Sequence, residues 1–352
     1  MLRQFNRKVD AMLAPKQRQN IVQSSHLIRI IRKIAGASVI TIKSTSQNVI
    51  LSSFTYFGFF SFITWYSIYF YSVYKMYSED QTILRSLYST KLKRYGDEVE
   101  RIIELIFSLY AMWKVPFDLS GSSEDMQQIV DIDKAIRDLS ESVDYKKNNN
   151  SVIFICIVQT FIIGTRVFSI WFSLYNLNLR LPSQKVFVII FTDAVTFIIV
   201  AQFCSYLVLL RKRYNILNRI LASIKVSEVL ISRVKLPRSV DNGSKIQNRF
   251  VADKIKACSN IHSMLFMAAQ TCNDKFGLVI LLTMLKNLIL IILHFFYFME
   301  ATAAALFKEP LVYIGFLVYV YWQICFSLAV IYVFIYYSES AVTEVTTKGC
   351  YR

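Results

Sequence analysis

Four titratable residues lie inside long apolar segments of the sequence, namely Arg166, Asp193, Lys286 and His294. Arg166 stands about nine residues before the end of one segment, and Asp193 about seven residues after the start of the next. At about 1.5 Å per residue, the two side chains lie at nearly equal depth, about 10–14 Å from one face of a membrane. Adjacent antiparallel helices can therefore join them as a buried ion pair.

Such a pair has two interpretations, which do not exclude each other. A structural pair fixes how two helices pack, whereas a ligand-site pair offers both charges to a polar small molecule. Lys286 lies near the middle of its segment, and a structural role is favoured for it, by snorkelling or by bonding to a neighbour. For His294, packing and hydrogen bonding within a helix bundle are favoured over contact with a ligand.

Aromatic side chains gather near the ends of the same segments, at Trp171, Tyr175, Tyr297 and Tyr313. Each one alone is interpreted as an anchor at the membrane surface, where Trp and Tyr are enriched. As a set they can also line a pocket, because aromatic rings stack on sugars and on alkaloid-like molecules. The candidate ligand-binding residues are Arg166, Trp171, Asp193, His294, Tyr297 and Tyr313.

Catalytic and metal-binding motifs are absent from the sequence. No GxSxG, HExxH or P-loop pattern occurs. The six cysteines form no CxxC pair and there are three histidines, so neither a metal cluster nor a cofactor is expected. We therefore expect a protein that binds its ligand and is not an enzyme.

The elements that must position these residues are membrane helices. Hydrophobic residues make up 55% of the chain and the mean hydropathy is +0.41, whereas soluble proteins are roughly 45–50% apolar. We predict an all-α, polytopic membrane bundle with six spans, at about 49–73, 99–117, 152–175, 186–210, 276–300 and 311–336. At 99–117, Glu100, Arg101 and Glu104 leave a short apolar run, so a buried amphipathic helix is the alternative there.

Amphipathic helices extend this bundle on one side of the membrane. Apolar residues recur at helical spacing over 118–150 and 211–273, where Ile261, Leu265 and Cys272 share one face. We expect a tail at 1–47, a bundle with these anchor helices at 48–336, and a short polar tail at 337–352. Pro237 and Gly243 indicate a linker over 226–246. The weakly amphipathic stretch 28–42 suits a membrane surface.

The formal net charge of +16 is concentrated beside the spans. This distribution favours positive-inside topology and contact with anionic lipid over nucleic-acid binding. Residues 1–47 carry nine Lys or Arg and one acid, while the loops after 152–175 and 276–300 carry two and one basic residues. The loop after 49–73 carries five and is discordant. We expect a plasma-membrane protein with a cytosolic N-terminus and no nucleic-acid partner.

Two N-glycosylation sequons, at Asn149 and Asn242, fall on the expected cytosolic side. We predict that neither carries glycan in cells, because sequons are modified on the lumenal side. Glycosidase treatment of the expressed protein should leave its electrophoretic mobility unchanged. A mobility shift that disappears in Asn149→Gln or Asn242→Gln would contradict the topology.

Three short segments carry a family resemblance. The residues are Ile132 and Asp133 before the third span, Gln202, Tyr214 and Leu217 in the fourth-span extension, and Ile261, His262, Leu265, Asn273, Phe276 and Gly277 in the fifth-span helix. These segments resemble the insect gustatory receptor family. The resemblance implies seven helical spans, an inside N-terminus, an anchor built from the extensions of spans four to six, and a tetrameric ligand-gated cation channel.

The function implied by the resemblance is that of a taste receptor subunit. It would bind small-molecule tastants in the outer half of the bundle and act as a homo- or hetero-oligomer in contact with membrane lipid. The family's seventh-helix signature, Thr-Tyr, five apolar residues and Gln-Phe, does not occur here, so the sequence resembles a member truncated before the last span. The alternatives are a non-conducting modulatory subunit and an unrelated multi-span transporter.

Overall fold

Helix α8 (Ser183–Arg233) is the axis around which the other helices pack. The computed structural model describes residues 26–44, 49–79, 91–114, 116–117, 119–141, 143, 145–176, 183–233, 241–303 and 310–349. In the most apolar 18-residue stretch of α8, 78% of the residues are buried, because the sequence there is apolar on every side. The other elements are α3 (His26–Ile34), β1 (Ile40–Ser44), β2 (Ile50–Phe54), α4 (Tyr56–Ser78), α5 (Lys91–Lys114), α6 (Leu119–Asp138), α7 (Tyr145–Asn176), α9 (Asp241–Ala303) and α10 (Pro310–Gly349).

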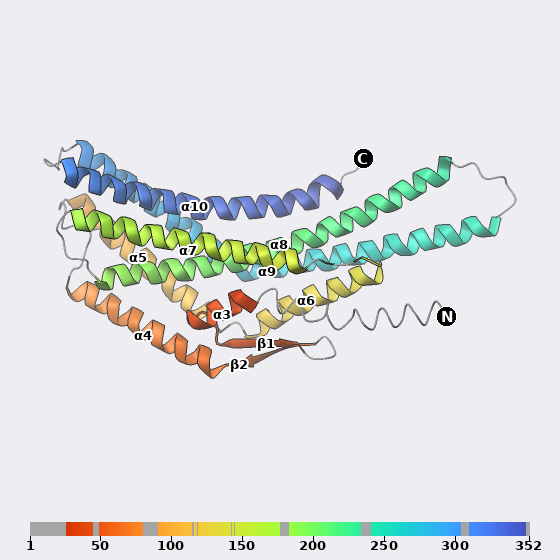
Figure 1. The fold of residues 1–352 in the computed structure, drawn as a ribbon, viewed down its shortest axis with the longest axis horizontal. Coiled ribbons are helices and arrows are strands. Elements are labelled where there is room, and N and C mark those ends of the chain that lie inside the picture. The colour runs from red at the N-terminus through yellow and green to blue at the C-terminus, as the bar shows by residue number, and fades with distance from the viewer. Residues whose placement is uncertain are drawn as a thin grey trace.

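Two helices are much longer than a bilayer is thick. α8 has 51 residues and α9 has 63, which correspond to about 75 and 95 Å against a hydrocarbon core of about 30 Å. In Figure 1 both run on to the right of the bundle, past the ends of α4, α5 and α7. We refer to these extensions, together with α6, which packs on α9, as the anchor.

Four helices are long and apolar enough to cross a membrane by length and composition: Ile157–Tyr175, Ser183–Ile224, Arg249–Ala303 and Pro310–Thr346. They correspond to the predicted spans three to six. Among the described residues, α4 and α5 do not meet that criterion. The all-α bundle is confirmed, and six spans stay a prediction.

Helix α5 shows why the predicted span 99–117 has so little apolar sequence. Three of its charged side chains, Asp97, Arg101 and Glu104, are buried in the bundle. Apolar side chains lie on both sides of the helix, because Phe107 is buried while Ile102 and Ile106 are about half exposed. Buried charges with exposed apolar residues are the reverse of a soluble amphipathic helix, and they suit a helix with lipid on one side and a polar interior on the other.

The predicted start of span one, at 49, is wrong. Residues Ile50–Phe54 form strand β2, which pairs antiparallel with β1, and α4 begins at Tyr56. The run from 49 onward is apolar and β-branched before it becomes aromatic, and such short runs do not distinguish strand from helix. The main-chain nitrogen of Ile50 also donates to the Gln127 side chain of α6, which holds the hairpin against the anchor.

Helix α3 occupies the first part of the predicted surface stretch 28–42, and β1 begins at Ile40. Its last carbonyl, that of Ile34, accepts hydrogen bonds from Ser61 at 2.6 Å and Trp65 at 2.8 Å, both on α4. Gly36 then turns the chain with φ of +68°, the left-handed conformation common after a helix end. The helix is therefore fixed to α4 by its C-terminus.

Gly58 allows the chain entering β1 to cross close to α4. A Cβ there would overlap the Ser38 carbonyl oxygen and lie 3.1 Å from the Val39 Cα. We expect Gly58→Ala to lower the free energy of unfolding by about 1–3 kcal/mol. The control is Gly164→Ala on α7, where an added Cβ meets nothing within 4 Å and the change should be neutral or stabilising by up to about 1 kcal/mol. Equal thermal midpoints for the two variants would contradict the close approach.

Three further boundaries differ from prediction. α8 continues to Arg233 and α9 begins at Asp241, so most of the predicted linker 226–246 is helical. α10 continues to Gly349, so the predicted tail 337–352 is helical over most of its length. The segment 118–150 divides into α6 and the first turns of α7. At the polar end of α10, packing against α8 holds the helix, since the Asn218 side chain donates to the Glu344 carbonyl oxygen at 2.9 Å.

Candidate functional site

A buried polar cluster lies where α5, α7, α8 and α9 meet. We call it the polar core and define it by Glu104 of α5, Arg166 of α7, Asp193 and Thr196 of α8, and Lys286 of α9. All five side chains are buried, with Thr196 at 1% exposure. Each charged member lies within electrostatic range of at least two others. Because burying charge among apolar helices is expensive, such a cluster points to a functional site.

The pair predicted from helix depth is present. Arg166 Nη1 lies 2.5 Å from Asp193 Oδ2, and each side chain is 6% exposed. The guanidinium carbon of Arg166 also lies 4.1 Å from the ring centroid of Phe326 on α10. The pair therefore links three helices, and a cation–π contact adds to the ionic one.

Lys286 differs from this pair because the structure gives it no carboxylate at bonding distance among the described residues. Its Nζ donates to the Thr196 hydroxyl at 3.2 Å and lies 4.6 Å from the ring centroid of Phe107. The side chain is 2% exposed. Of the two structural roles predicted for it, snorkelling is thus wrong and bonding to a neighbour is confirmed.

Two residues of this region, Glu104 and Lys185, are not among the candidate site residues predicted from the sequence. Lys185 Nζ lies 3.9 Å from Glu104 Oε2, and both side chains are buried. One turn further along α5, the hydroxyls of Ser108 and Thr192 lie 3.5 Å apart. The available signal was the spacing of Asp97, Arg101, Glu104 and Ser108, which places polar residues on one helical face.

His294 and Tyr297 lie in a second buried layer, nearer the end of the bundle where α9 ends and α10 begins. Their ring centroids are 5.8 Å apart, and the Tyr319 ring of α10 lies 6.1 Å from His294. His294 Nδ1 is 2.7 Å from the Leu290 carbonyl oxygen, as expected for a packed histidine. Tyr297 packs against Gly96 of α5, where a side chain would overlap the phenol.

The other two candidate ligand residues differ in position. Trp171 is 46% exposed and its ring lies between those of Phe168 and Tyr175 on the outer surface of α7. Tyr313 is partly buried against the cluster that contains Tyr297, and its hydroxyl lies 3.1 Å from that of Thr302. The structure therefore brings Arg166 and Asp193 together, places His294 and Tyr297 in the interior with Tyr313 packed against their layer, and leaves Trp171 at the surface.

A second set of buried charges joins the helices of the anchor. Arg213 of α8 donates to both carboxylate oxygens of Asp133 on α6, each at 2.7 Å, and to the Leu209 carbonyl oxygen at 2.8 Å. Lys275 of α9 donates to Asp125 of α6 at 2.6 Å. Helix α6 is thus bonded to both long helices.

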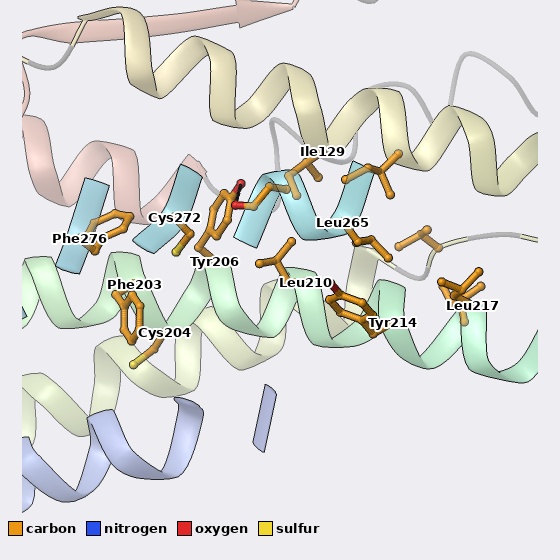
Figure 2. Packing of buried hydrophobic residues seen from close by; sticks show 14 of the residues in the cluster. Ile129, Phe203, Cys204, Tyr206, Leu210, Tyr214, Leu217, Leu265, Cys272 and Phe276 are labelled. Carbon is orange, nitrogen blue, oxygen red and sulfur yellow. Dashed lines mark hydrogen bonds between the residues drawn. The ribbon is translucent and has the colours of Figure 1, made fainter. Parts of the chain in front are cut away.

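These ion pairs border an apolar cluster between α6, α8, α9 and α10, shown in Figure 2. Its members include Ile129 and Ile132 of α6, Tyr214 and Leu217 of α8, and Ile261, Leu265 and Phe276 of α9. The amphipathic faces predicted for the anchor helices are therefore the buried faces. His262 and Asn273 are exposed, and Gly277 is partly buried. His262 touches the Tyr214 ring, with centroids 6.0 Å apart.

The described residues contain no group of three or more His, Cys, Asp or Glu placed to hold a metal ion. The polar core is a set of charges, hydroxyls and ring faces, which can bind polar groups. No curated protein matches the chain. A family model described as 7tm chemosensory receptor matches residues 49–347, which is most of the chain and includes every element from β2 to α10. This multi-pass membrane protein therefore belongs to the 7tm chemosensory receptor family.

Proposed function

We propose that this chemoreceptor chain is a taste receptor subunit that binds a small-molecule tastant at the polar core. The observation that carries the proposal is the burial of Lys286 beside the Arg166–Asp193 pair, at the junction of four helices. Charges in such a place are costly to keep and are typical of ligand and ion sites in membrane proteins. The packed His294 and Tyr297 provide an aromatic layer next to the core.

The proposed output is the opening of a cation channel that several subunits form in the plasma membrane, with the N-terminus in the cytosol. α8 and α9 each run without a break from the polar core into the anchor. A ligand that favours one arrangement of these helices shifts the population of the anchor's arrangement as well. The anchor is the expected contact between subunits, whether the oligomer is a homo- or a hetero-tetramer.

The test is a calcium-imaging assay in cells that express the chain with other members of its family. We expect a response to at least one compound in a panel of sugars and bitter molecules. Thr196→Ala should raise the half-maximal concentration several-fold, because it removes the hydroxyl that positions Lys286. The matched control is Thr165→Ala, at an exposed hydroxyl on α7.

Two outcomes would contradict the proposal. Silence toward the whole panel in cells that display the protein at the surface would contradict a taste receptor function. Suppression of the current carried by its partners, without a response of its own, would instead favour the non-conducting modulatory role.

A further inference from the structure

We propose that the ligand of the polar core carries a carboxylate, which pairs with Lys286. This inference rests on the proposed function and names the chemical class of the ligand. Buried polar groups in proteins are normally hydrogen-bonded, so buried donors without partners indicate the chemistry of a ligand that would bind there.

Lys286 and side chains on the neighbouring helices include buried hydrogen-bond donors with unused capacity. The Arg166 Nε and the Gln323 Nε2 are buried and have no hydrogen-bond partner within the described part of the chain. The ammonium of Lys286 has three protons, and in the same part of the chain the structure gives it one hydrogen bond, to Thr196. Three cationic or amide donor groups thus have unused capacity in one region of the bundle.

These donors lie close to one another. Lys286 and Arg166 are within electrostatic range, and the Arg166 guanidinium lies over the Phe326 ring of α10. Gln323 lies one helical turn before Phe326 on the same buried face, which is about 4.5 Å along the axis. The three donors therefore come from α7, α9 and α10, and α10 packs against both of the other two helices.

The carboxylates already present do not fill this need. Asp193 Oδ2 accepts from Arg166 Nη1, and Glu104 lies 3.9 Å from Lys185. One nearby acceptor, Asn287 Oδ1, also lacks a partner within the described residues, but it is neutral and is outnumbered by the donors. Asp193 and Glu104 both lie within electrostatic range of Lys286, but within the described residues neither is at salt-bridge distance from it. A carboxylate bonded directly to Lys286 is therefore expected to come from outside the chain.

A carboxylate fits these donors better than a neutral polar group does. It offers two oxygens with about four acceptor positions and no proton of its own, and charge-assisted hydrogen bonds are the stronger ones. A neutral sugar would supply hydroxyls to the same donors but would leave the ammonium of Lys286 without a directly bonded counter-charge. An organic cation would meet three donor groups and would add a positive charge beside Lys286 and Arg166.

The experiment compares probes that share one shape and differ in the head group. The full chain is purified into lipid nanodiscs, and its thermal midpoint is measured against increasing hexanoate, hexanamide and 1-hexanol at pH 7. A ligand that binds the folded state raises the midpoint according to its affinity. We expect hexanoate to bind at least about 10-fold more tightly than hexanamide or 1-hexanol.

Variants assign this preference to the core. Lys286→Gln should abolish the preference for hexanoate, and Lys286→Arg should keep most of it. Gln323→Leu should weaken hexanoate binding several-fold. This second variant tests the inference even if Lys286→Gln does not fold. The matched control is Lys254→Gln on the anchor part of α9, where the ammonium lies over the Phe250 ring and no change is expected.

The outcomes separate this inference from the proposed function. If hexanamide, 1-hexanol or a neutral sugar stabilises the protein as well as hexanoate does, the carboxylate inference is wrong while a ligand-binding core stands. If none of the acids, sugars and bitter compounds shifts the midpoint, the proposed function fails as well. Stabilisation by chloride alone would identify an inorganic anion site and overturn the inference. Competition by oleate would show that the carboxylate comes from a membrane fatty acid.

Discussion

Replacing Asp133 with alanine is expected to lower the free energy of unfolding by about 3–5 kcal/mol. The arginine that it contacts, Arg213, is completely buried and donates to both of its carboxylate oxygens. Without Asp133 the guanidinium keeps the Leu209 carbonyl as a partner but loses its counter-charge, and a buried charge without a counter-charge is strongly destabilising. Chemical or thermal unfolding of the purified protein in detergent measures the loss.

A second ion pair near the end of α6, also made with α8, provides a control for this prediction. Glu141, just beyond α6, lies 3.8 Å from Arg219 of α8, but both side chains are well exposed. Glu141→Ala should therefore change stability by no more than about 1 kcal/mol. The double variant Asp133→Leu with Arg213→Met should recover most of the loss, because it removes both charges and keeps apolar volume. Equal effects of Asp133→Ala and Glu141→Ala would contradict a special role of the buried pair.

Replacing Arg166 with alanine is expected to have a comparable effect inside the bundle. Asp193 would keep its charge among apolar helices with its 2.5 Å partner gone, at a cost of about 3–5 kcal/mol. We expect the amount of Arg166→Ala at the cell surface to fall to a small fraction of the wild-type amount. Surface labelling with an antibody to an added epitope measures it.

The neutral double variant separates structure from function at this pair. Arg166→Met with Asp193→Leu removes both charges and should restore surface expression, since only packing is then required. If the pair also serves the ligand, this variant should be displayed normally but should not respond to ligand. A normal response would instead assign the pair to helix packing alone. Lys75→Ala is the control, because the Lys75–Glu79 pair of α4 is exposed.

The parts of this site that sequence predicts are those fixed by one helix or by two adjacent ones. Counting residues from the ends of two apolar segments places Arg166 and Asp193 at equal depth, and the pair forms. Helical periodicity likewise places Ile261, Leu265 and Cys272 on one face, and that face is buried in the anchor. In both cases the positions of the residues within one helix, or within two consecutive helices, are enough to predict the contact.

The parts that sequence does not predict depend on which side of a helix faces lipid. The charges of α5 look unfavourable for a span until the structure shows Glu104 pointing inward and Ile102 outward. Trp171 is of a residue type that is common in binding pockets, yet its side of α7 faces away from the bundle. The strand at 50–54 forms because β1 is there to pair with it, and pairing between two short strands leaves no helical period in the sequence.

The unbroken length of α9 has a mechanical consequence. The bond between Lys275 and Asp125 holds the helix to α6 at a point 11 residues from Lys286 and 34 residues from Asp241. With that bond as a fulcrum, the helix is a lever with arms of about 16 and 51 Å. As long as it stays straight, a sideways shift of about 1 Å at the polar core becomes about 3 Å at the far end of the anchor. A ligand that moves Lys286 by less than the length of a covalent bond would thus produce a larger displacement at the far end of the anchor, where the proposed function places the contact between subunits.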